Sequence, residues 1–146
     1  EEIMDAISKK ALLLHKRKIF IEEVPFIGLG GSNPTIFDTP FEMSEKEIES
    51  SLDPLMEMNA VLVLHAPPMG INDTIPSGAH VGSSAVKMIV DKYHPRLVLS
   101  GHIHEARGIV EENKTIFINP GPAMNGFSAI VTINGDKIET EMLELK

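Results

Sequence analysis

Three histidines stand at the ends of apolar runs, and imidazole is among the commonest metal ligands in proteins. His102 and His104 follow the apolar run at 97–100, and His65 directly follows the run at 60–64. In an extended stretch, residues i and i+2 face the same side, so His102 and His104 could bind one metal ion or two adjacent ions. A His-x-His pair taken alone is a weak signal, because such pairs also serve structural or incidental purposes. The elements that carry the three histidines therefore decide the interpretation.

The segment between the two apolar runs predicts how the histidines are brought together. Residues 82–93 have the apolar spacing of a helix, and His94-Pro95 ends it. A strand, a helix and a second strand form a crossover unit, which is almost always right-handed with parallel strands. Parallel strands end at the same edge of a sheet, where ligand sites of open α/β sheets form. We therefore expect His65 to meet His102 and His104 at that edge.

The rest of the chain alternates short strands with helices, as in one α/β domain. Ser44 and Glu47 have the spacing of a helix N-cap with its capping box. Asn134-Gly135 between two alternating segments is a strong hairpin signal. The expected elements are helices at 2–12, 45–58 and 82–93, strands at 18–21, 26–29, 60–64, 97–100, 108–110 and 115–118, and a hairpin of 127–133 with 137–145.

Composition excludes several classes of protein. The chain has 146 residues, 42% of them hydrophobic, which suits one globular domain. It has no cysteine, so a metal site must use His, Asp, Glu, Asn or backbone oxygen, which favours Zn, Mn, Fe, Ni or Mg. The net charge of −8 argues against broad nucleic-acid binding but leaves a nucleotide or phosphoester substrate open. We see no transmembrane run and no signal peptide, and we expect a cytoplasmic protein without membrane association.

A long loop at about 65–80 separates His65 from the next helix, and loops of this length are usually functional or disordered. His80 lies at the end of this loop, just before the helix. It could contact a substrate phosphate, aided by the free backbone N–H groups of the helix start. A plain loop residue, or a contact at the N-terminus of the helix, is at least as good an interpretation of His80. His15 and His94 are expected at the surface, and Asn119 is expected to stabilise its own turn.

Four segments resemble a known family. The sequence reads Val-Leu-His-Ala-Pro-Pro at 63–68, Leu-Val-Leu-Ser-Gly-His-Ile-His-Glu at 97–105 and Ile-Asn-Pro-Gly at 118–121. Together these resemble the C-terminal half of a calcineurin-like metallophosphoesterase. Gly-Gly-Ser-Asn-Pro at 30–34 resembles a branch of small phosphoesterases in archaea and bacteria. The resemblance covers most of the chain, from about residue 26 to its end.

The resemblance implies an α/β fold, the second half of a four-layer α-β-β-α metallophosphoesterase sandwich. It also implies a hydrolase with two divalent metal ions (Mn, Fe, Zn or Ni), in which His65 and His102 ligate one ion and His104 ligates the other. The implied reaction is hydrolysis of a phosphodiester or phosphomonoester by a metal-activated hydroxide. The substrate would be a phosphoester small molecule or a nucleotide, and the sequence names no catalytic residue beyond the metal ligands.

The sequence departs from the family pattern in one large respect. The family's Asp-x-His, Gly-Asp-x-x-Asp and Gly-Asn-His-Asp/Glu motifs are absent, and Asp73 and Asp91 lack the context of such motifs. We therefore expect residues 1–146 to be a single domain that is incomplete at its N-terminus and binds metal weakly when alone. The alternatives are a non-catalytic binding module that a partner completes or that is inactive, and a mononuclear metal-binding protein. Strands left at open edges would favour a homo-oligomer.

Overall fold

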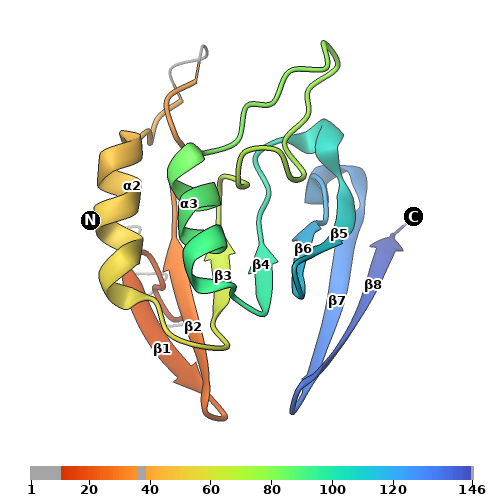
Figure 1. Ribbon diagram of the computed structural model, residues 1–146. Helices are drawn as coiled ribbons and strands as arrows, with labels where there is room; N and C mark the ends of the chain where they lie inside the picture. Colours follow the sequence, from red (N-terminus) through yellow and green to blue (C-terminus); the bar gives the residue numbers. More distant parts are fainter. Residues whose placement is uncertain (1–10, 36–38, 146) are drawn as a thin grey trace.

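The computed structural model describes residues 11–35 and 39–145, so the helix expected at 2–12 lies almost wholly outside the described part (Figure 1). None of the described helices is long and apolar enough to span a membrane. The strands and helices, in chain order, are β1 (Arg17–Ile21), β2 (Val24–Leu29), α2 (Glu45–Leu52), β3 (Val61–Leu64), α3 (Ser84–Tyr93), β4 (Leu97–Leu99), β5 (Gly108–Glu112), β6 (Thr115–Asn119), β7 (Phe127–Asn134) and β8 (Lys137–Glu144). Short 3-10 turns lie at Asp53–Leu55, His104–Ala106 and Ala123–Asn125.

The six-stranded sheet has the order β1-β2-β3-β4-β6-β5. Its four inner strands are parallel, and β1 and β5 pair antiparallel to β2 and β6 at the two edges. The predicted crossover is confirmed, because β3 and β4 are parallel neighbours joined through α3, with Val61 opposite Leu97 and Val63 opposite Leu99. The carboxyl ends of β2, β3, β4 and β6 therefore lie along one edge of the sheet.

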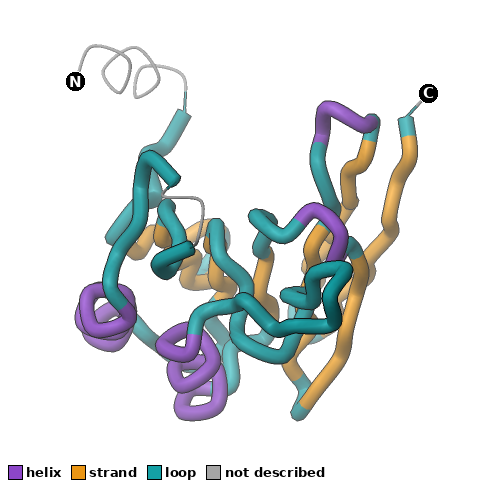
Figure 2. Tube along the Cα trace, turned by 90° about the horizontal axis from the view of Figure 1, so that it is seen from above, coloured by secondary structure: helices purple, strands orange, loops and turns teal. Residues whose placement is uncertain are grey.

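Two apolar clusters show how the layers pack. One cluster joins inner-strand residues such as Ile27 and Leu62 to residues of both helices, among them Leu52 and Ile89. The other cluster joins the strands through Val61 and its neighbours to the β7–β8 hairpin. Because neighbouring residues of a strand point to opposite faces, the helices cover one face of the sheet and the hairpin covers the other. The helices lie side by side, and the hairpin lies apart from them (Figures 1 and 2).

The chain thus forms a helical layer, a six-stranded layer and a two-stranded layer of an α/β sandwich. The predicted hairpin is confirmed, with Asn134 paired to Lys137 at its turn. The predicted capping box is also confirmed: Ser44 accepts from the Glu47 N–H, and the Glu47 carboxylate accepts from the Ser44 N–H at 2.8 Å.

The length predicted for α2 is wrong. This helix ends at Leu52 rather than near residues 56–58, and a 3-10 turn follows it. Pro54 explains the difference, because proline has no N–H with which to continue the hydrogen-bond ladder of an α-helix.

Candidate metal centre

Backbone hydrogen bonds place His65 beside the loop that carries His102. His65 directly follows β3, and its N–H donates to the carbonyl of Leu29 in β2 at 3.1 Å. Its carbonyl accepts a hydrogen bond from the Gly101 N–H at 3.0 Å. The ends of three parallel strands therefore converge on His65.

The structure brings His65 and His102 into direct contact. Nδ1 of His102 lies 3.0 Å from Nε2 of His65, and the ring centroids are 4.8 Å apart at an angle of 60°. The contact between His65 and His102 that the crossover unit predicted is therefore confirmed. Their role as metal ligands stays a prediction.

The two nitrogens lie at hydrogen-bonding distance, which brings two possible metal ligands together. Within residues 11–35 and 39–145, however, no group of three or more His, Asp or Glu side chains could hold a metal ion. The pair therefore fits one part of a ligand set.

The backbone at the second and third histidines differs from the extended stretch that the sequence suggested. His102 has a φ of 64°, in the left-handed region, and His104 begins a 3-10 turn. The argument that alternation along a strand puts both side chains on one side is therefore wrong. A non-glycine residue with positive φ is uncommon and is held by its surroundings. Both residues nevertheless line the same cavity.

Burial and neighbouring charge favour the neutral, ligating form of the paired histidines. Partial desolvation, together with the nearby His104, lowers the pKa of His65 below its ordinary value, although the residue keeps contact with solvent. Burial lowers the pKa of His102, and His65 and His104 add to the effect, while the Glu42 carboxylate opposes it. Hydrogen bonds from Thr35 and Thr39 lower the pKa of Glu42 to about 2. Neutral imidazole is the form that binds metal, so the site favours cation binding near neutral pH.

Asn119 fixes the loop between the second and third histidines. Its side chain is fully buried, and Nδ2 donates to the carbonyl of Ile103 at 2.7 Å. Its Oδ1 accepts from the Gly121 N–H at 3.0 Å. The sequence predicted only the second contact, which stabilises the turn after β6. The first contact connects β6 to the histidine loop.

A cavity of about 660 Å³ opens beside this loop, and His80, His102 and His104 line it together with Asn33, Glu45 and Met69. Its volume lies in the usual range for small-molecule sites, about 300–1,000 Å³. The structure therefore brings His80 to the same cavity as two of the predicted ligands, although its role as a substrate contact stays a prediction.

The helix start beside His80 is already occupied. The Glu45 carboxylate accepts from the N–H groups of Ser84 and Ala85 at 3.1 and 2.9 Å. Ser83 accepts from the Val86 N–H at 3.1 Å. The expectation that free N–H groups at this helix start would help bind phosphate is therefore wrong. A carboxylate from the neighbouring helix takes that place.

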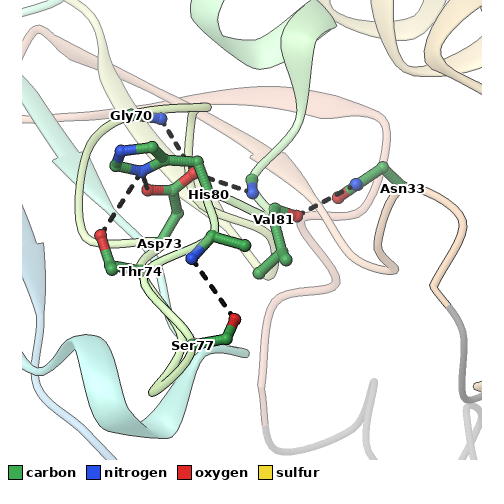
Figure 3. Close-up of polar contacts among 9 residues, drawn as sticks. Asn33, Gly70, Asp73, Thr74, Ser77, His80 and Val81 are labelled. Carbon is green, nitrogen blue, oxygen red and sulfur yellow. Dashed lines mark hydrogen bonds and ion pairs between the residues drawn. The ribbon is translucent and has the colours of Figure 1, made fainter.

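A buried carboxylate that the sequence analysis set aside lies behind His80. Asp73 Oδ1 is 2.7 Å from Nδ1 of His80, and Oδ2 accepts from the N–H groups of Gly70 and Gly82, each at 2.9 Å (Figure 3). Thr74 Oγ1 also lies 3.4 Å from Nδ1. The clue in the sequence was an aspartate inside the long loop, seven residues before the histidine.

The two remaining histidines differ from each other. His94 is exposed, as predicted, and adopts the left-handed conformation that ends α3. The surface position expected for His15 is wrong, because it is half-buried and its Nδ1 accepts from the Gly30 N–H at 3.0 Å. Its ring also lies 5.2 Å from that of Phe41. His15 therefore supports the loop after β2.

Comparisons with known proteins show the family. The profile of the family described as "Metallophosphoesterase, calcineurin superfamily" matches residues 14–143. An uncharacterised protein of Methanocaldococcus jannaschii is 36% identical over 129 residues, which cover 84% of this chain and 59% of that protein. Metallophosphoesterase domain-containing protein 1 of Homo sapiens is 33% identical over 61 residues, which cover 40% of this chain and 19% of that protein.

Solved structures share the fold. One crystal structure matches with a TM-score of 0.76 at 20% identity, covering 99% of this chain and 60% of its own. The crystal structure of a Thermus thermophilus protein matches with a TM-score of 0.59 at 16% identity, covering 96% of this chain and 63% of that one. The chain thus spans about three fifths of the archaeal relative and of both solved chains, 59%, 60% and 63% respectively. From the family match over residues 14–143, the chain belongs to the calcineurin-like metallophosphoesterase superfamily.

Proposed function

We propose that this chain contributes part of the active site of a divalent-metal-dependent phosphoesterase. The observation that carries the proposal is the contact of His65 with His102, whose Nε2 and Nδ1 lie 3.0 Å apart at the carboxyl edge of the sheet. Family membership supports a phosphoesterase activity in general. Divalent metal ions, when bound, supply a nucleophilic water and positive charge at the phosphoryl oxygens.

In this proposal, Nε2 of His65 and Nδ1 of His102 hold one ion, and His104 contributes to a second. Neutral imidazoles bring no negative charge, and two dications about 3.5–4 Å apart repel strongly unless carboxylates offset them. Carboxylate ligands would then come from outside the residues that the structure describes. The cavity of about 660 Å³ is large enough for a nucleotide or a similar phosphoester, which is our proposed substrate class.

The test uses the protein expressed from its complete gene. It is stripped with EDTA, and Mn, Zn, Ni or Fe(II) is added back with bis(4-nitrophenyl) phosphate or 4-nitrophenyl phosphate as substrate. We expect metal to restore hydrolysis of at least one ester, and His102→Ala to reduce the rate at least about 100-fold, an effect typical of lost metal or acid–base groups. His94→Asn is the matched control, because this exposed histidine ends α3 at the opposite edge of the sheet. Hydrolysis that survives EDTA unchanged would refute the proposal.

A second function has its own support. No three ligand side chains converge within the described ranges, which is what a binding module with an incomplete site would show. Such a module would bind a phosphoester or a partner without hydrolysing it. Metal-dependent turnover by the complete protein decides against the module, whereas ligand binding without turnover decides for it.

A further inference from the structure

Among the described residues, one buried polar side-chain atom has no hydrogen-bond partner, and it belongs to Asn33. Asn33 follows β2, is 8% exposed and lines the cavity of about 660 Å³. Its Nδ2 donates to the carbonyl of Val81 at 3.2 Å (Figure 3). Its Oδ1 is the atom without a partner. A buried acceptor without a donor is destabilising, so such a group in a native protein calls for an explanation.

The contacts around Asn33 fix Oδ1 as an acceptor. If the amide were turned over, Oδ1 would face the Val81 carbonyl, and two acceptors would oppose each other. The backbone is held as well, because the Ser32 N–H donates to the carbonyl of Phe41 at 3.1 Å and the Ser32 carbonyl accepts from the Met43 N–H at 2.8 Å. The unpaired oxygen is therefore held in place before any ligand binds.

The other groups around the cavity indicate what kind of ligand could supply the missing donor. Within the described ranges, neither lysine nor arginine lines this cavity, whereas the carboxylates of Glu45 and Glu105 do. Met69 and Ile75 contribute apolar surface. Additional phosphate groups would meet carboxylates and no cation here. An uncharged organic group with an N–H or O–H donor would instead meet apolar surface and an acceptor at Asn33.

We propose that Oδ1 of Asn33 accepts a hydrogen bond from the organic group of a phosphoester bound in this cavity, and so selects substrates with an N–H or O–H donor. The inference rests on the proposed phosphoesterase function and deepens it by naming a residue that determines specificity. The phosphoryl group lies at His102 and His104, and the organic group extends towards Asn33. In a nucleoside ester, the donor is an amino group of the base or a hydroxyl group of the sugar. A substrate with that donor satisfies the acceptor and is bound more tightly in the transition state.

The test compares three 4-nitrophenyl esters of nucleoside 5′-phosphates, which share one leaving group. The parent nucleoside is 2′-deoxyadenosine, whose donors are the amino group of its base and the 3′-hydroxyl of its sugar. One analogue has purine in place of adenine and lacks the amino group, and the other has 2′,3′-dideoxyadenosine and lacks the hydroxyl. With the complete metal-loaded wild type, we expect one analogue to have a kcat/KM about 10- to 100-fold below that of the parent. The affected analogue identifies the donor.

Two results with the wild type would overturn the inference without any variant. One is an equal kcat/KM for the three esters. The other is hydrolysis of bis(4-nitrophenyl) phosphate without hydrolysis of the parent ester. In both cases, metal-dependent hydrolysis of bis(4-nitrophenyl) phosphate would leave the proposed function standing. A wild type without metal-dependent hydrolysis would overturn both proposals.

Asn33→Ala tests whether this residue recognises the donor. We expect the variant to lower kcat/KM for the parent about 10- to 100-fold and to bring the parent and the affected analogue within about threefold of each other. This ratio does not depend on the folded fraction of the variant, and Asn33→Leu replaces Asn33→Ala if the latter does not fold. A preference that persists without Asn33 would overturn the inference. Asn33→Asp keeps an acceptor oxygen but loses the N–H donated to Val81, so it should keep the preference, and a lost preference would contradict the role of Oδ1.

Two controls separate donor recognition from other roles. Nδ2 of Asn72 also donates to a backbone carbonyl, that of Gly108 at 3.4 Å, but Asn72 lines a neighbouring cavity. Glycine suits the φ of 52° at this position, so Asn72→Gly is the matched variant, and a changed preference there would contradict the assignment to Asn33. Calorimetry should show that Asn33→Ala binds Mn²⁺ as the wild type does. A weaker affinity would make Oδ1 a metal ligand and overturn the inference.

Discussion

Replacing Asn119 by alanine tests whether this one side chain holds the histidine loop in place. The change removes a side chain that is 0% exposed and that binds both the carbonyl of Ile103 and the N–H of Gly121. The Ile103 carbonyl still accepts from the Ala106 N–H at 3.1 Å, so the Gly121 N–H is the group that loses its partner. Each buried polar group that loses its partner costs about 1–3 kcal/mol. We therefore expect Asn119→Ala to lower the free energy of unfolding by about 1–3 kcal/mol, a substantial part of the stability of a typical domain.

Urea unfolding followed by circular dichroism measures this loss as a lower midpoint with an unchanged slope. Asn125→Ala is the matched control, because Asn125 is exposed and should change stability by less than about 0.5 kcal/mol. The same Asn119 variant should bind Mn²⁺ more weakly, since the loop that carries two proposed ligands loses its anchor. A loss of stability below about 1 kcal/mol, with unchanged metal affinity, would refute the reasoning.

Three further predictions concern the supports of the site. Glu45→Ala removes the side chain that caps α3 and should lower the free energy of unfolding in urea by about 0.5–2 kcal/mol. Glu49→Ala, on the exposed face of α2, should leave it almost unchanged, and equal effects of the two variants would contradict the capping role. Gly82→Ala places a Cβ 2.7 Å from facing backbone and should lower the thermal midpoint through a loss of about 1–3 kcal/mol, whereas Gly101→Ala meets nothing within 4 Å and should be tolerated. Partial burial lowers the pKa of His65 and of His102 below the ordinary 6.5, so the metal-free folded chain binds fewer protons than the unfolded chain. The folded chain should therefore lose stability as the pH falls below about 6.5. An NMR titration in which His65 or His102 has a pKa above 6.5 would contradict this.

The sequence predicted those parts of the fold that depend on local patterns and general topology. The apolar runs and the intervening helix implied parallel strands, and this alone brought His65 to the loop of His102. Asn134-Gly135 implied the hairpin, because the tight turns that join two antiparallel strands strongly prefer this dipeptide. In each case the information lies within a segment or in a rule that holds for most α/β proteins.

The features that sequence analysis missed depend on contacts between distant or irregular segments. Glu45 caps a helix that begins 39 residues later, and no local pattern records such a pairing. Asp73 and His80 meet because the long loop folds back on itself through contacts that have no sequence period. The left-handed φ of His102 replaced the extended backbone that a His-x-His pattern suggested. Tertiary packing, not propensity, decides such positions.

The central claim, that His65 and His102 share a metal ion, is tested most directly by crystals of the complete protein grown with Mn²⁺. Data collected at the manganese absorption edge locate the ion independently of any assumption about its ligands. The account predicts an anomalous peak within about 2.0–2.4 Å of both Nε2 of His65 and Nδ1 of His102, at the carboxyl edge of the sheet. An ordered site without a peak there, or a manganese ion bound elsewhere while the two rings stay in contact, would contradict it.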